Sequence, residues 1–141
     1  MLEEVSLKAI HENGEPTTAK LEQMEQLILK GEHLVLQTLN FDLEIETPYK
    51  HLASALEKFK AEQWYPVFAQ VAWNFVNDGL MTTVCLQFKP RQIAGAAFYL
   101  ASRCLRVKLP LDTENPWFLE FDMSIPQLED ICCQLLEIYG T

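Results

Sequence analysis

The sequence lacks every short motif that marks a common reaction centre. It contains no glycine-rich phosphate loop, no Gly-x-Ser-x-Gly and no HExxH. Its three histidines, His11, His33 and His51, are scattered, and none has a metal-ligand spacing with a cysteine. Its many carboxylates fall on the expected solvent faces of helices, so they predict no paired-acid site. We therefore expect a protein that is not an enzyme and that binds neither a metal ion nor a cofactor.

Long apolar runs are also missing. No run approaches the ~20 residues that span a bilayer, and the N-terminus lacks the basic region and apolar core of a secretory signal, so we expect no membrane partner. Apolar residues nonetheless make up 49% of the 141 residues and include three Trp and eight Phe. This composition is typical of a globular protein with a sizeable core.

Positive charge is scarce and unevenly placed. The net charge of −9 opposes the phosphate attraction that dominates nucleic-acid affinity, so we expect no direct nucleic-acid binding. Residues 80–111 carry five basic side chains and no acidic one, whereas residues 112–141 carry seven acidic side chains and no basic one. The five basic residues are Lys89, Arg91, Arg103, Arg106 and Lys108.

These five cations have two explanations. Arg103, Arg106 and Lys108 are expected to end a helix, where cations complement the helix dipole. Lys89 and Arg91 fall at the other end of that helix, where the dipole does not explain them. The sequence leaves open whether these two residues form a docking patch for an acidic partner.

The four cysteines are expected to be reduced. They are Cys85, Cys104, Cys132 and Cys133, and three of them fall on strongly apolar faces. Adjacent Cys132 and Cys133 are poorly placed to pair with each other. We interpret the set as core thiols of an intracellular protein.

Helical patterns fill the chain, and no useful period-two segment appears, which predicts an all-α fold. Capping residues and prolines predict where five helices start. The starts are Thr17 or Thr18, Pro48 after Thr47, Pro66, Pro90, and the capping box of Ser124 with Gln127. Residues 5–10 indicate the tail of an earlier helix. The first of these helices carries an apolar stripe of Leu21, Met24, Ile28, Val35 and Leu39. Gly31 lies on this stripe, so we expect a close helix contact there.

The helix after Pro90 is the most informative segment. It is almost entirely small or apolar, and a helix that is apolar all round belongs at the centre of a bundle. Its small residues, which would let neighbouring helices approach closely, are Ala94, Gly95, Ala96, Ala97 and Ala101.

Two further groups of side chains have both a structural and a functional interpretation. They are the polar set Asn74, Asn77 and Asp78 and the aromatic set Trp117, Phe118 and Phe121. For the polar set we favour hydrogen bonding at a helix end over a functional site. For the aromatic set we favour packing beneath a loop over a partner groove.

Residues 72–100, with the pattern Pro-x-x-Ile-Ala at 90–94, resemble the second cyclin box of a transcriptional cyclin, of the type of cyclins T, K and L, with cyclin T first. Residues 36–43, followed by Pro48 and Tyr49, resemble the join between the two boxes of that family. Residues 116–121 and 127–131 resemble the end of the second box, and a faint repeat aligns residues 32–39 with 129–136. Where the family usually shows glycine, this chain has Asn40.

The resemblance implies a cyclin-fold helical bundle around a central apolar helix. Residues 1–46 would be the end of a first box and residues 47–141 a second box, so the chain is expected to be a fragment or a truncated form. The apolar stripe of the first helix would then be exposed, which predicts self-association or a fold-back onto the second box.

The resemblance also implies a function. A nuclear regulatory subunit of this type binds and activates a cyclin-dependent protein kinase that acts on the RNA polymerase II tail. Matching positions make Glu32 and Phe41 kinase-facing residues. Two alternatives remain, a cyclin-fold module of the general-transcription-factor type and a structural adaptor without a kinase partner.

Overall fold

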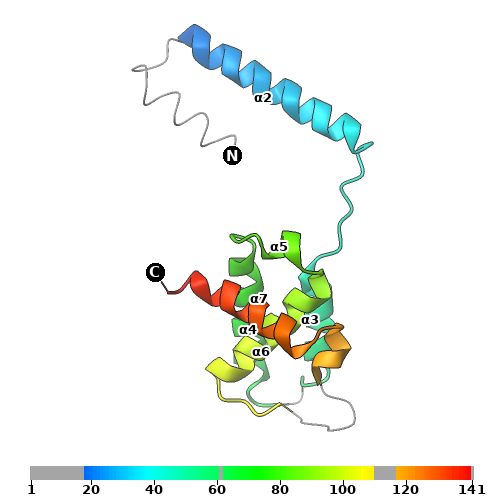
Figure 1. The fold of residues 1–141 in the computed structure, drawn as a ribbon, viewed down its shortest axis with the longest axis vertical. Coiled ribbons are helices and arrows are strands. Elements are labelled where there is room, and N and C mark those ends of the chain that lie inside the picture. The colour runs from blue at the N-terminus through cyan, green and yellow to red at the C-terminus, as the bar shows by residue number, and fades with distance from the viewer. Residues whose placement is uncertain (1–17, 61, 110–116, 141) are drawn as a thin grey trace. The chain divides into compact units, whose positions relative to one another are not determined.

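The computed structural model describes residues 18–60, 62–109 and 117–140, and all of the regular elements in these ranges are helical (Figure 1). In chain order they are α2 (Thr18–Thr38), α3 (Pro48–Glu57), α4 (Tyr65–Gly79), α5 (Val84–Gln87), α6 (Pro90–Cys104), the 3-10 helix η1 (Trp117–Phe121) and α7 (Ile125–Glu137). The prediction of an all-α fold is confirmed. The helix tail expected at residues 5–10 lies outside the described residues.

The chain divides into two compact units, one ending at Ile45 and the other beginning at Glu46. Helix α2 belongs to the first unit, and the remaining helices belong to the second. The division falls one residue before the predicted boundary between a first and a second cyclin box. The assignment of the units to those boxes stays a prediction.

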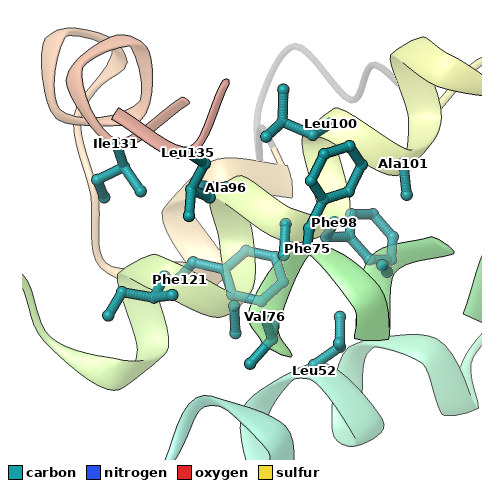
Figure 2. Packing of buried hydrophobic residues seen from close by; sticks show 14 of the residues in the cluster. Leu52, Phe75, Val76, Ala96, Phe98, Leu100, Ala101, Phe121, Ile131 and Leu135 are labelled. Carbon is teal, nitrogen blue, oxygen red and sulfur yellow. The ribbon is translucent and has the colours of Figure 1, made fainter. Parts of the chain in front are cut away.

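Helix α6 is the centre of the second unit. It packs against α3, α4, α5, α7 and η1, and its buried residues run almost without interruption from Gln92 to Ser102. Figure 2 shows Leu52 of α3, Val76 of α4 and Leu135 of α7 in the buried cluster that also contains Ala96 of α6. The sequence-based expectation of a central apolar helix is therefore confirmed.

Small residues on α6 are buried, and one of them, Gly95, is required by close packing against η1 and the segment after it. Ala94, Ala96 and Ala97 are fully buried. A Cβ atom placed on Gly95 would lie 2.8 Å from Cβ of Phe121 and would also overlap the side chain of Met123. Glycine at this position therefore lets the segment that contains Phe121 and Met123 reach the backbone of α6.

The helix starts follow the local signals in the sequence. Prolines stand in the first turns of α3, α4, α6 and α7, where a missing N–H costs nothing. In the capping box of α7, the backbone N–H of Ser124 donates to Oε1 of Gln127 at 2.9 Å, and the backbone N–H of Gln127 donates to Oγ of Ser124 at 3.5 Å. Thr47 occupies the cap position of α3, but its side chain makes no capping hydrogen bond.

The predicted core location of the cysteines is wrong for three of the four. All four thiols are free, but Cys85, Cys104 and Cys133 are exposed and only Cys132 is buried. Cys85 lies on the four-residue helix α5, and Cys104 is the last residue of α6, so neither position faces the centre of the bundle. Cys133 follows Cys132 on α7 and therefore points about 100° away from it.

Helix α6 ends earlier than its basic residues suggested. Its last residue is Cys104, so Arg103 lies in the final turn, but Arg106 and Lys108 lie beyond the helix. The chain leaves α6 through a left-handed residue, Arg106, whose φ is 54°. The dipole explanation therefore applies to Arg103 alone.

Helix α2 does not show the contact that was expected at Gly31. A Cβ atom on Gly31 would meet nothing within 4 Å, and α2 has no buried residue among the parts of the chain that the structure describes. Most of its apolar side chains are instead exposed. The largest exposures on this helix belong to Leu27, Leu29, Leu34 and Val35.

Candidate functional site

The described residues contain no arrangement that favours metal chemistry. Within residues 18–60, 62–109 and 117–140, no group of three or more His, Cys, Asp or Glu side chains is placed to hold a metal ion. In the same ranges, no helix combines the length and apolar character needed to cross a bilayer. Three surfaces of the described residues are the candidate sites.

The first surface is the exposed face of α2 and the turn that follows it. Glu32 is exposed in the middle of the helix, and Phe41, just after the helix, leaves 60% of its surface open to solvent. Both belong to the unit that ends at Ile45. A carboxylate and an aromatic ring are thus both available to a partner on this unit.

The turn after α2 explains why Asn40 stands where the family usually has glycine. The N–H of Asn40 donates to the carbonyl of Gln37 at 3.0 Å, and the N–H of Phe41 donates to the carbonyl of Leu36 at 2.9 Å. This pair of bonds defines a Schellman motif, which needs a left-handed residue after the helix. Asn40 has a φ of 54°, and asparagine tolerates that region better than other non-glycine residues. The turn fixes the position of the Phe41 backbone.

The second surface surrounds Lys89 and Arg91 at the start of α6. Nζ of Lys89 lies 3.3 Å from Oδ2 of Asp122, in a pair that is largely exposed. Arg91 lines a small pocket with Glu120, whose carboxylate also pairs with Lys58 at 2.5 Å. Carboxylates from η1 and the residue after it therefore offset much of the positive charge that the sequence indicated here.

The polar set at the end of α4 is used for hydrogen bonds, as expected. Tyr49 donates to Oδ1 of Asn77 at 2.6 Å, which links α3 to α4. Tyr139 donates to the carboxylate of Asp78, which links the residues just after α7 to α4. Burial, with a further contribution from Asp78, raises the pKa of Tyr139 to about 12. Tyr139 is therefore protonated, and able to donate, at neutral pH.

The aromatic set packs against α6, while the loop beneath which we expected it to pack lies outside the described residues. Phe121 is buried, and its ring lies 5.9 Å from the ring of Phe98. The rings of Trp117 and Tyr99 are stacked, with centroids 5.7 Å apart and planes 7° apart. Phe118 is half-buried against the core. These contacts anchor η1 on the central helix.

A third surface was not identified as a site from the sequence. Beyond the end of α6, a groove of about 710 Å³ lies beside the Tyr99–Trp117 stack. Its lining includes Arg103, Arg106 and Lys108. The sequence contained their charges, but the helix dipole offered a sufficient explanation, and only the structure brings all three to one groove with Trp117.

Comparison with known proteins points to one family, although no protein-family model matches the chain. The chain is 51% identical to cyclin-T1-4 of Arabidopsis thaliana, over 96% of this chain and 26% of that protein. It is 56% identical to cyclin-T1-5 of the same plant, over 84% of this chain and 20% of that protein. It is 48% identical to cyclin-T1-3 of Oryza sativa subsp. japonica, over 96% of this chain and 28% of that protein. The chain thus spans 20–28% of the length of these relatives, and with its all-helical structure it is a cyclin T-like protein.

Proposed function

We propose that this chain forms part of a regulatory subunit that binds and activates a transcriptional cyclin-dependent kinase. The observation that carries the proposal is the 48–56% identity to proteins named cyclin T1 over 84–96% of the chain. By the same proposal, the kinase acts on the RNA polymerase II tail and the subunit is nuclear. The subunit performs no chemistry and needs no cofactor.

The proposed architecture assigns the two units to two cyclin boxes. Residues up to 46 would close a first box, and residues 47–141 would form a second. The division of the structure between Ile45 and Glu46 supports this assignment. So does the arrangement of α3, α4 and α7 around α6.

The proposed mechanism is differential binding. A subunit that binds the active kinase conformation more tightly than the inactive one shifts the kinase population toward activity. Glu32 would meet a cationic side chain of the kinase, and Phe41 would meet an apolar one. Their exposure on the unit that ends at Ile45 leaves both available for such contacts.

Lys89 and Arg91 are proposed as a secondary docking patch. An acidic partner would have to compete with Asp122 for Lys89 and with the neighbouring Glu120 near Arg91. Exposed pairs of this kind contribute little, about 0–1 kcal/mol, so exchange of the partner carboxylate is energetically accessible. The contribution of this patch to affinity should therefore be small.

A chimaera provides the test of the kinase proposal. The chain would replace the matching segment of Arabidopsis thaliana cyclin-T1-4, and the product would be mixed with a purified transcriptional cyclin-dependent kinase. We expect a stable complex and increased phosphorylation of an RNA polymerase II tail peptide. The substitution Glu32→Ala should weaken the complex about tenfold or more, because a charge that loses water at an interface matters more than an exposed one.

A matched control is Glu22→Ala, which removes an exposed carboxylate from the same helix. It should leave kinase affinity unchanged. Equal affinities for the Glu32 and Glu22 variants would remove Glu32 from the proposed interface. A chimaera that folds but binds no kinase would favour an adaptor, or a module of the general-transcription-factor type, over a kinase regulator.

A further inference from the structure

We infer that the groove at the end of α6 binds an acidic segment of a partner protein. We call it the α6-end groove, and it is lined by Tyr99, Ser102, Arg103, Arg106, Val107, Lys108, Leu109 and Trp117. It lies on the second unit and is distinct from the α2 surface and from the Lys89–Arg91 patch. The inference does not rest on kinase binding.

The floor of the groove is held in place by the core. The ring of Trp117 stacks on the ring of Tyr99 and lies 6.0 Å from the ring of Phe98. Contact with the buried Phe98 holds Trp117, and through the stack Tyr99, in position. The Ser102 hydroxyl is already used, since it donates to the carbonyl of Tyr99 at 2.6 Å. Within the described residues, the groove offers a ligand an aromatic surface beside cationic side chains.

The rim of the groove is cationic and is not neutralised by the described part of the chain. Arg103, Arg106 and Lys108 are all exposed. The ion pairs found among the described residues involve His51, Lys58, Lys60 and Lys89 and none of these three cations. In a chain whose net charge is −9, this groove is a local exception that complements carboxylates.

The backbone conformation of Arg106 is a second indication that the α6-end groove is a binding site. The N–H of Arg106 donates to the carbonyl of Arg103 at 3.4 Å, and that of Val107 donates to the carbonyl of Ser102 at 2.9 Å. These bonds form a Schellman motif in which Arg106 holds the left-handed position usually given to glycine. An arginine is less stable than glycine there, and strained residues of this kind cluster at binding sites.

A short acidic peptide fits these features better than a nucleic acid. Electrostatic forces are screened beyond about 10 Å at 0.1 M salt, so a short ligand responds mainly to the local cations. A long phosphate chain would extend over the acidic remainder of the surface. The aromatic floor would accept an apolar side chain between the carboxylates of the peptide.

Fluorescence anisotropy with the whole 141-residue chain tests the inference. The probe is a labelled peptide that repeats Asp-Glu-Leu, and the control peptide repeats Asn-Gln-Leu. We expect saturable binding of the acidic peptide that weakens as salt rises, and no binding of the control. No saturable binding at low salt would overturn the inference, as would tighter binding of a single-stranded oligonucleotide.

The groove variant is Arg103→Gln combined with Arg106→Gln and Lys108→Gln. It should weaken peptide binding about tenfold or more, because three exposed charge pairs are lost and each contributes a factor of up to several. If the triple variant folds poorly, the single variant Arg106→Gly tests the same groove. It should weaken binding while making the turn more stable, and a purely structural role for Arg106 would not produce that combination.

The matched control removes three exposed cations from other helices, through Lys20→Gln, Lys30→Gln and Lys50→Gln. It should leave peptide affinity within about twofold of the parent chain. Equal losses in the control and in the groove variant would show that only net charge matters, which would refute the site.

The chain itself supplies a further test. Residues 110–116 lie between Leu109 and Trp117 in the sequence, are outside the described residues and include Asp112 and Glu114. Replacing Asp112 with Asn and Glu114 with Gln removes two negative charges from the sequence between groove residues Leu109 and Trp117. The peptide should bind this variant at least as tightly as the parent, and weaker binding would contradict a cationic site.

Discussion

The backbone N–H of Val107 donates to the carbonyl of Ser102 at 2.9 Å, and this bond closes the last turn of α6. It forces Arg106 into a φ of 54°. Left-handed backbone costs a non-glycine residue roughly 1–2 kcal/mol, and glycine escapes that cost but has more conformational entropy in the unfolded chain. Because the strain exceeds the entropic advantage, arginine at position 106 makes the turn less stable than glycine would.

The first prediction follows from that balance. Arg106→Gly should raise the free energy of unfolding by about 0.5–1 kcal/mol, as measured by urea denaturation. Arg103→Gly removes the same charge three residues earlier, inside the helix, and should lower stability by about 1 kcal/mol. If both substitutions destabilise the protein equally, the side chain of Arg106 stabilises the turn by more than the strain it carries.

The second prediction concerns the centre of the bundle. Ala97 is fully buried on α6, so Ala97→Leu should destabilise the protein by roughly 1–3 kcal/mol, because overpacking forces neighbouring helices apart. Ala53→Leu makes the same change at an exposed position of α3 and should leave the melting temperature nearly unchanged. An unaltered melting temperature for Ala97→Leu would contradict the central position of α6.

The third prediction concerns the thiols. Burial, with a smaller effect of the neighbouring Cys133, raises the pKa of Cys132 to about 12, so its reactive thiolate form is scarce at pH 8. In the native protein, a thiol reagent at pH 8 should modify the other three cysteines quickly and Cys132 only on unfolding. Cys132→Ser should abolish the slow phase. Four equal rates would show that Cys132 is accessible.

Local signals explain why most of the fold could be predicted. Pro48, Pro90 and the Ser124–Gln127 box act within one helical turn, so their consequences can be read from neighbouring residues. The small residues of α6 likewise require close neighbours, whichever helices supply them. Signals of this kind set helix starts and identify the central helix without knowledge of the tertiary structure.

The surfaces depend on residues far apart in sequence and were predicted less well. Lys89 meets Asp122 across 33 positions, so the sequence overstated the positive charge at the start of α6. Arg106 occupies a position at which glycine would have signalled the helix end, and its presence suggested a longer helix. The α6-end groove could not be predicted, because it forms only when the chain turns at Arg106 and Trp117 stacks on Tyr99.

The last prediction concerns α2, a 21-residue helix that has no buried residue in the described part of the chain. Most helical stability in proteins comes from packing of an apolar face, yet Leu27, Ile28, Leu34 and Val35 each leave more than half of their surface exposed. A face of that size should find a partner, and a second copy of the same helix is available in solution. We therefore expect the 141-residue chain to self-associate, with a sedimentation coefficient that rises with protein concentration.

Substitutions distinguish self-association through α2 from association through the second unit. Ile28→Glu combined with Val35→Glu should restore a monomer, because charge on the apolar face opposes its burial. Leu86→Glu combined with Leu119→Glu adds the same charge at exposed apolar positions of the second unit and should leave the association intact. A parent chain that stays monomeric at all concentrations, while α2 amides resist hydrogen exchange, would indicate that α2 folds back onto the second unit instead.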